Sequence, residues 1–381
     1  MKTLLTRATV ATLLTATAIS TAHAGDGWDL FHGAPKFKDD NGNSLKVRGR
    51  IFFDVASIDE TRKVGTAADA ENNEFRTARL GFEGQYDSMK FKFETDFSGS
   101  EIAVKDASVT FGKFAGTNVA LTIGQMKTTN SLNETTSGRH ITFMERAAFT
   151  DAFGIDRRVG VKATVKGKQH LLEGGVYRNS INGMQEDQDE NTVYSARAVF
   201  LPAMEKDSLI HLGASLRYTD EQNSGAPGRS SRWGAHLATE KVKPIIGDDA
   251  TLWGVEAATV QGPFHAQAEY MSEDGSLGDA NGYVVSAGWF LTGESRGYKL
   301  GKFDRTKPSN PVSNGGYGAW EIAARYDTID ATSASDEESS AATIGLIWYP
   351  ESHLRFKLEA IEADADTYDA SGVQLRTQID W

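Results

Sequence analysis

Polar and apolar residues alternate along most of this chain, and the last nine residues show the pattern most clearly. Residues 373–381 place Val, Leu, Thr, Ile and Trp on one face of an extended strand, and Gln, Arg, Gln and Asp on the other. The closing strand of an outer-membrane β-barrel needs two such faces, because one meets lipid and the other a wet lumen, while a terminal aromatic ring lies at the bilayer interface. Soluble strands alternate as well, so the prediction depends on how often the pattern recurs.

Further segments repeat this period of two. In residues 46–55, Lys, Arg, Arg and Asp alternate with Val, Gly, Ile, Phe and Val, and in residues 89–97, Lys, Lys, Glu and Asp alternate with Phe, Phe, Thr and Phe. Comparable runs occupy residues 77–83, 158–165, 211–218, 263–270, 320–327 and 353–360. An α-helix would show a period of about 3.6 residues, which these runs lack. The pattern therefore predicts an all-β chain.

The lengths of the connections predict the topology, because bacterial barrels have short periplasmic turns and longer external loops. Short connections fall at 85–88, 113–116, 166–168, 202–207, 261–263 and 350–352, and longer polar ones at 57–73, 127–157, 179–190, 219–250, 272–280, 328–339 and 362–371. Counting every alternating piece gives an odd number of strands and places the termini on opposite sides. Assigning residues 233–237 to an external loop gives a sixteen-stranded antiparallel transmembrane β-barrel, with one long periplasmic connection at 292–317.

The start of the chain predicts export. Residues 1–24 have a basic beginning, an apolar stretch and a final Ala22-His23-Ala24, which together are typical of a cleaved signal peptide; the alternative is an N-terminal helix of the folded protein. Residues 25–44 would form a short periplasmic lead-in and residues 45–381 the barrel. The 381 residues include no Cys, which excludes a disulfide scaffold, and no stretch long and apolar enough for a membrane-spanning helix. We expect the outer membrane of a Gram-negative bacterium.

Short motifs, in order along the chain, resemble those of the phosphate-selective porin O and P family. They are FRTARLG at 75–81, FKFETDF at 91–97, VKDA at 104–107, TIGQMK at 122–127, ITFMER at 141–146, RRVG at 157–160, FLTGE at 290–294, GAWE at 318–321 and AARY at 323–326. The resemblance implies a homotrimer of sixteen-stranded barrels whose pores carry phosphate or polyphosphate past clusters of Arg and Lys. It predicts the fold and the compartment better than the solute, because selectivity depends on a few lumen side chains.

The formal net charge of −12, taken alone, argues against an anion channel. The acidic residues, however, are dense in the predicted external loops, whereas the predicted lumen faces are richer in cations. Selectivity is set where a pore is narrow and its walls have a low dielectric constant. At physiological salt, charges in the external loops are screened beyond about 8 Å.

The third external loop, residues 127–157, is the expected narrow point, because the corresponding loop of sixteen-stranded porins folds inward. It carries Lys127, Arg139, His140 and Arg146, and some of these must pair with acidic residues of the same loop. Arg suits phosphate because its planar fork donates two hydrogen bonds to an oxyanion. The candidates for lining the pore or binding anions are Lys46, Arg48, Arg50, Arg76, Arg79, Asp96, Asp106, Lys127, Arg139, Arg146 and Arg158.

Each candidate has a simpler interpretation. Lys46, Arg48 and Arg50 could be a solvated ladder without selectivity, since polar lumens are general. Arg76 is out of phase with the lumen face of its strand and could extend toward the membrane interface instead. Arg146 could form an ion pair with the adjacent Glu145 that fixes the loop. Asp96 and Asp106, which resemble family positions that could orient cations, could be ordinary solvated side chains.

Other classes of function fit less well. There is no G-x-S-x-G motif, the His residues have no metal-ligand spacing, and neighbouring His and Ser on one strand cannot converge on a substrate, so no enzyme, cofactor or metal site is expected. Nucleic acid is not an expected partner; the expected partners are small anions and outer-membrane lipid. The main alternative is a general diffusion porin for small hydrophilic solutes, and a structural or adhesion barrel is the third possibility.

Overall fold

The computed structural model describes residues 35–65, 68–183, 192–205, 207–220, 230–247, 249–335 and 337–381. The predicted signal peptide, the first ten residues of the predicted lead-in (25–34) and most of the predicted loop 179–190 lie outside these ranges. The described part of the lead-in contains strand β1 (Lys36–Lys38), which pairs with the beginning of β2 (Ser44–Arg62). No helix in the described ranges is long and apolar enough to cross a membrane.

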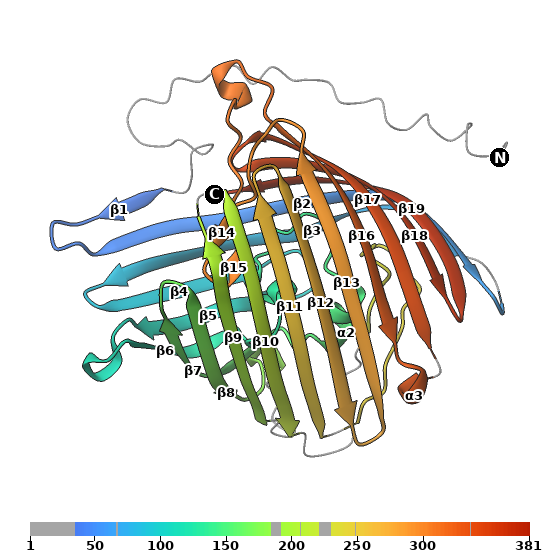
Figure 1. Cartoon of the computed structure of the whole chain (residues 1–381), viewed down its shortest axis with the longest axis horizontal. Helices are drawn as coiled ribbons and strands as arrows, with labels where there is room; N and C mark the ends of the chain where they lie inside the picture. The colour runs from blue at the N-terminus through green and yellow to red at the C-terminus, as the bar shows by residue number, and fades with distance from the viewer. Residues whose placement is uncertain are drawn as a thin grey trace.

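Sixteen antiparallel strands form a closed barrel, as predicted (Figure 1). Each pairs with its neighbour in the sequence, and the last strand pairs with β2 to close the sheet. Closure leaves no sheet edge whose backbone groups would lack partners in lipid. After β2 the strands are β3 (Ala68–Tyr86), β4 (Met89–Asp96), β5 (Ala103–Phe111), β6 (Val119–Lys127), β7 (Arg157–Lys166), β8 (His170–Tyr177), β9 (Thr192–Met204), β10 (Ser208–Asp220), β11 (Ala250–Gln261), β12 (Phe264–Gly275), β13 (Gly278–Phe290), β16 (Ala319–Asp330), β17 (Glu338–Glu351), β18 (Leu354–Ala365) and β19 (Tyr368–Asp380).

Burial alternates along the strands in the predicted phase. In β2, Arg48 and Arg50 are buried, whereas Ile51 remains 39% exposed. In β18, Lys357 is buried and Leu358 is 46% exposed. Apolar side chains therefore point outward and charged ones inward, as a membrane barrel with a polar interior requires.

The two ends of the barrel differ in their connections. The end where β2 begins and β19 finishes, here called the terminal end, carries short turns such as 87–88, 262–263 and 352–353. It also carries the long connection between β13 and β16, residues 291–318, at the predicted position. The opposite end, here called the loop end, carries the segment 230–247, in which residues 233–237 form no strand, as predicted.

Three loop-end connections are less than half as long as predicted. The strands continue through most of 57–73, 272–280 and 362–371, leaving connections of 63–67, 276–277 and 366–367. Acidic residues suggested loops there, but a strand that extends beyond the bilayer can carry polar side chains on both faces while its backbone pairs remain complete. Acidic composition alone was therefore a poor guide to strand ends.

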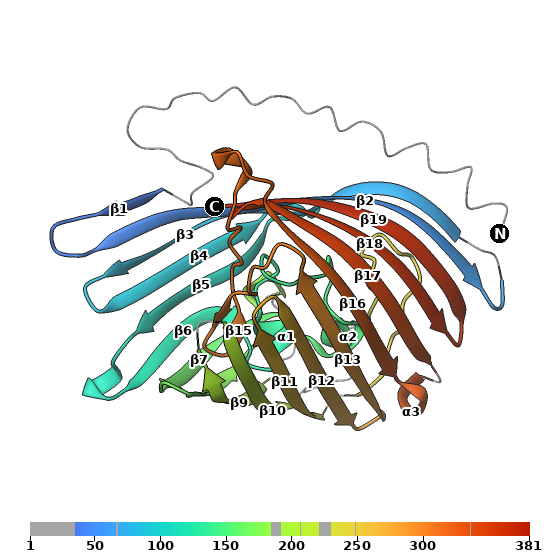
Figure 2. The same cartoon turned by 45° about the horizontal axis from the view of Figure 1, so that its top comes forward.

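Connecting segments occupy the interior of the barrel. The β6–β7 segment, residues 128–156, contains α1 (Leu132–Thr135) and α2 (Ala148–Phe153), which the strands surround in Figure 2. The connection 291–318 contains the short hairpin β14 (Tyr298–Lys299) and β15 (Lys302–Phe303) and the turn η3 (Val312–Asn314). The remaining short elements are η1 (Phe114–Gly116), η2 (Ile181–Gly183) and α3 (Thr332–Ser335).

Apolar clusters hold these segments inside. Leu132 of α1 and Phe303 of β15 share one cluster with inward-facing residues of β8 to β11. Phe149 and Phe153 of α2 share another with residues of 230–247 and of β11, β12, β13 and β16. At these two clusters, the inner face of the barrel is therefore apolar rather than polar.

The terminal Trp381 closes the seam between β19 and β2, since its backbone N–H donates to Gly49 at 3.0 Å and its carbonyl accepts from Gly49 at 3.2 Å. We predict that deleting Trp381 lowers the folded fraction, measured by heat-modifiable migration in detergent gels. Phe200→Ala, which removes a 54% exposed ring far from the seam, is the control and should fold normally. Equal losses in the two variants would contradict this role.

Candidate functional site

The inner wall formed by β2, β3 and β4 carries three guanidiniums around one carboxylate. Glu94 of β4 lies 2.7 Å from Arg50, 3.2 Å from Arg79 and 3.4 Å from Arg48, measured between carboxylate oxygens and guanidinium nitrogens. All four side chains face inward because their strands alternate in phase. Arg48 also pairs with Glu83, and Arg79 pairs with a further carboxylate of β4, Asp96. The three guanidiniums are therefore held between three carboxylates, and this patch is close to neutral.

The same arrangement continues along β4, β5 and β7. Asp106 lies 2.8 Å from Lys92 and 3.4 Å from Arg157, and Asp156 lies 2.7 Å from Arg157 and 3.4 Å from Lys105. Asp96 binds Arg79 at 2.7 Å. Because buried cations need hydrogen-bond acceptors, these carboxylates hold the cations in fixed orientations rather than merely offsetting them.

Glu145 is the main anchor of the β6–β7 segment. Its carboxylate accepts two hydrogen bonds from Arg76 of β3, at 2.9 and 2.8 Å, and one from Arg376 of β19 at 2.6 Å. Its backbone carbonyl accepts from Arg325 of β16 at 2.7 Å. Burial raises the pKa of Glu145, but the charges of Arg76 and Arg376 outweigh it and hold the pKa well below its usual range.

Backbone groups of the same segment bind the wall formed by β18 and β19. Lys357 donates to the carbonyls of Ile141 at 2.9 Å and Phe143 at 3.0 Å, and the N–H of Met144 donates to Glu359 at 2.6 Å. Side chains on this wall are almost fully buried, whereas Lys92 on β4 keeps 35% of its side chain exposed. Water therefore reaches the lysines of β4 to β7 more readily than the β18–β19 wall.

The 291–318 connection approaches the β6–β7 segment from the terminal end. Tyr298 hydrogen-bonds His211 of β10 at 2.6 Å, and Arg197 of β9 donates to the carbonyl of Gly301 at 2.8 Å. The N–H of Phe303 donates to Thr136 of the β6–β7 segment at 3.3 Å, so the two segments touch. The sequence predicted the place of this connection but not that it lies inside the barrel.

Arg76 points into the lumen, although strict alternation places it on the outer face. In the β2–β3 pairing, Phe52 lies opposite Thr77 and Phe53 opposite Phe75, so Arg76 is an extra residue in a β-bulge. A bulge reverses the phase of a strand, which explains why sequence periodicity placed this side chain wrongly.

The other candidates fall into two groups, one on the wall formed by β2 to β5 and one near the ends of β6 and β7. Arg48, Arg50, Arg79, Asp96 and Asp106 form the wall described above, and Lys46 lies opposite Glu83 near the start of β2. In the second group, Lys127 binds both the carboxylate and the carbonyl of Glu134 at 2.7 Å, and Arg158 contacts Asn179 at 3.4 Å among other partners.

Two candidates in the β6–β7 segment, Arg146 and Arg139, differ in their hydrogen-bond partners. Arg146 fixes the segment, as considered above, but through the carbonyls of Asn133 at 3.0 Å and Thr136 at 2.8 Å rather than through Glu145. Arg139 is buried, and its Nε has no hydrogen-bond partner within the described ranges.

Sequence reasoning gave too little weight to Lys92, Lys105, Arg157 and Arg296. Lys92 follows the alternation of β4, which placed it on the predicted lumen face, but it was not among the candidates for binding anions. Arg296 lies in the 291–318 connection. This connection is unusually long for the terminal end, where the other turns are short, and that length was the available signal. Among the described residues, no three His, Cys, Asp or Glu side chains are arranged to hold a metal ion.

The barrel, its outward apolar face and its charged, partly filled lumen define the class of outer-membrane porins. Comparison with solved structures agrees on the fold. The anion-selective porin from Comamonas acidovorans matches with a TM-score of 0.57 at 13% identity, over 89% of this chain and 100% of that one. The channel DcaP of Acinetobacter baumannii matches with a TM-score of 0.56 at 16% identity, over 91% of this chain and 99% of that one.

The sequence model described as phosphate-selective porin O and P matches residues 45–380, and the chain belongs to this family. Porin O of Pseudomonas aeruginosa is 28% identical over 85% of this chain and 83% of its own length. An uncharacterised protein of Caulobacter vibrioides is 32% identical over 86% of this chain and 69% of its own length. The protein is thus a channel of the Gram-negative outer membrane rather than an enzyme.

We predict that Glu145→Gln destabilises the folded barrel by about 3–5 kcal/mol, the usual effect of removing one partner of a buried ion pair, because Arg76 and Arg376 lose their shared acceptor. Unfolding in denaturant measures the change. Asp364→Asn is the matched control, since Asp364 is 75% exposed and should change stability by no more than about 0.5 kcal/mol. An equally small effect of both substitutions would show that Glu145 does not anchor the segment.

Proposed function

We propose that this porin conducts small anions, with phosphate or polyphosphate as its solute. The supporting observation is the sharing of carboxylates on the inner wall, where Glu94 serves three guanidiniums and Asp106 serves Lys92 and Arg157. An anion that moves along this wall meets cations already held in place, so little reorganisation accompanies each contact. The paired cations of this wall are Arg48, Arg50, Arg79, Lys92, Lys105 and Arg157, and their carboxylates are Glu83, Glu94, Asp96, Asp106 and Asp156. The surplus of one positive charge lies where low-dielectric walls concentrate the field.

The acidic net charge does not oppose this proposal. Acidic residues at the loop end such as Asp364 and Asp369 are 75% and 58% exposed, and Lys63 lies within 3.6 Å of both. Water and salt screen such charges within about 8 Å. The local charge of the narrow zone therefore governs selectivity, and the charge of the whole chain mainly affects the rim.

We place the narrow zone where the β6–β7 segment meets the 291–318 connection. Phe303 and Thr136 join the two segments, and Lys127 and Arg139 lie on the first of them. A phosphate passing there would lose hydrogen bonds to water and gain hydrogen bonds from Arg and Lys side chains. Several of these side chains already donate to acceptors on the wall. Binding would then be weak enough to permit release, which conduction requires.

We also propose that three copies assemble in the membrane. OmpT of Vibrio cholerae, a structural neighbour with a TM-score of 0.51, has been solved in a trimer form. The family's description as phosphate-selective and the anion selectivity stated for the Comamonas acidovorans porin support an anionic solute in the same way. Each of these points describes a relative and supports the proposal for this chain only by similarity.

Conductance in planar bilayers tests the solute. We expect wild-type channels in a KCl gradient to have a reversal potential that favours chloride, and phosphate to reduce the chloride current. The triple variant Lys92→Gln, Lys105→Gln, Lys162→Gln should shift the reversal potential toward cations and weaken the block, because it removes the more exposed lumen cations. These three side chains are 35%, 20% and 19% exposed.

The matched control is Lys36→Gln, Lys38→Gln, Lys168→Gln, which changes the net charge equally at exposed positions of the terminal end. It should leave both readouts unchanged. Wild-type channels that prefer potassium and resist millimolar phosphate would instead support a general diffusion porin.

A further inference from the structure

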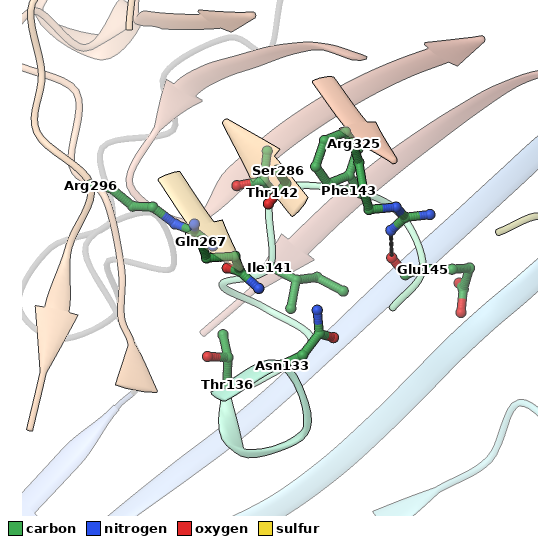
Figure 3. A pocket seen from close by; sticks show the side chains of 10 residues that line it. All are labelled: Asn133, Thr136, Ile141, Thr142, Phe143, Glu145, Gln267, Ser286, Arg296 and Arg325. Carbon is green, nitrogen blue, oxygen red and sulfur yellow. Dashed lines mark hydrogen bonds between the residues drawn. The ribbon is translucent and has the colours of Figure 1, made fainter. Parts of the chain in front are cut away.

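A pocket lies beside the narrow zone, between the β6–β7 segment and the inner face of β12, β13 and β16 (Figure 3). About 350 Å³ of space there is not filled by protein atoms, and part of it is open to solvent. Arg296, from the 291–318 connection, lines it from the terminal end. Its neutral polar lining consists of Asn133, Thr136, Thr142, Gln267 and Ser286.

Arg296 is a buried charge with few partners. It is 8% exposed, and no described carboxylate lies within ion-pair distance of its guanidinium. The guanidinium stacks 3.4 Å from the centroid of the Phe303 ring, and Nη1 lies 3.3 Å from Nδ1 of His265. Burial lowers its pKa to about 10, so the side chain stays charged at neutral pH. A buried guanidinium with five N–H donors needs more acceptors than one imidazole supplies.

The other two charged residues of the pocket have partners elsewhere. Glu145 binds Arg76 and Arg376, and Arg325 lies 2.8 Å from Asp327. Arg296 is therefore the charge in this pocket without a described carboxylate at ion-pair distance; Glu321, which acts on it from farther away, is bound to the other ring nitrogen of His265 at 2.7 Å. The pocket is positive at its Arg296 end.

Neutral donors complete the lining. Gln267 uses one amide hydrogen on Glu269, at 3.1 Å, and retains a second. Thr136 accepts from Phe303 through its hydroxyl oxygen, which leaves the hydroxyl hydrogen available. Ser286 and Thr142 add two further hydroxyls. A guanidinium fork with several hydroxyl and amide donors matches the acceptors of a tetrahedral oxyanion.

We propose that this pocket binds one small oxyanion of phosphate size, held by Arg296 with Gln267, Ser286 and Thr142. The site lies behind the β6–β7 segment, away from the lysines of β4 to β7, so its ion does not belong to the conducting path. The bound ion joins the 291–318 connection, the β6–β7 segment and the barrel wall. It requires only the folded barrel and does not depend on the anion selectivity proposed above.

The position of the ion can be tested directly with selenate, whose selenium scatters anomalously. Crystals of the whole protein soaked in selenate should show an anomalous peak within hydrogen-bond distance of Arg296 and Ser286. Arg296→Gln should abolish this peak. Lys299→Gln, which removes an exposed charge from the same connection, should retain it.

Binding in solution is measured by the thermal unfolding midpoint in phosphate, compared with chloride at equal ionic strength. Phosphate should raise the midpoint of the wild type and of Lys299→Gln. For Arg296→Gln, the phosphate concentration that gives half of this rise should increase at least about tenfold, as expected when charge-assisted hydrogen bonds are lost. Since Arg296→Gln could impair folding, the double variant Gln267→Leu, Ser286→Ala provides a second test and should also weaken the effect.

Three outcomes would overturn the proposal: a wild-type pocket without a selenate peak, a peak that Arg296→Gln leaves intact, or a phosphate shift equal in all variants. Peaks only along Arg50 and Arg79 would place anions on the conducting wall and not in this pocket. Current block by phosphate, measured separately, depends on that wall. The failure of either proposal is therefore distinguishable from the failure of the other.

Discussion

The arrangement of the lumen depends on the Glu145 carboxylate. It accepts hydrogen bonds from Arg76 on β3 and Arg376 on β19, while its backbone carbonyl accepts from Arg325 on β16. A buried carboxylate with two guanidinium partners is held far more rigidly than one in water. One residue of a connecting segment thereby determines how far that segment stands from three parts of the wall, and so how much of the interior stays open.

The remaining lumen charges follow from this position. The β6–β7 segment covers β18 and β19, where Lys357 serves its carbonyls, and leaves the lysines of β4 to β7 accessible to water. Cations beneath the segment fix it in place, whereas those on the open wall share carboxylates with one another and exceed them by one charge. Arg and Lys thus fix the β6–β7 segment where it covers them, and remain accessible to water and solutes where it does not.

The outer surface could be predicted from the sequence, because contact with lipid imposes a local rule on every second residue. The strand number and the place of 291–318 required the connection lengths as well, because alternation alone gave an odd number of strands. Arg76 could not be placed, since a single extra residue in β3 reverses its direction. The partnership of Arg376 with Glu145 spans 231 positions and has no local signal. Leu171 and Val199 point inward against apolar segments, so alternation says little about what fills the barrel.

The pairing of Arg376 with Asp54 has a consequence for the order of assembly. These residues are 322 positions apart, on the two strands that meet at the seam, and Arg376 also holds Glu145. Bringing such distant parts of a chain together carries a loop-closure entropy that must be overcome before the contact contributes stability. Pairing of the first and last strands meets this cost and also brings Arg376 to the position from which it anchors the β6–β7 segment. We expect an assembling chain to pass through a wide, water-filled cylinder, whose interior narrows only after the sheet has sealed.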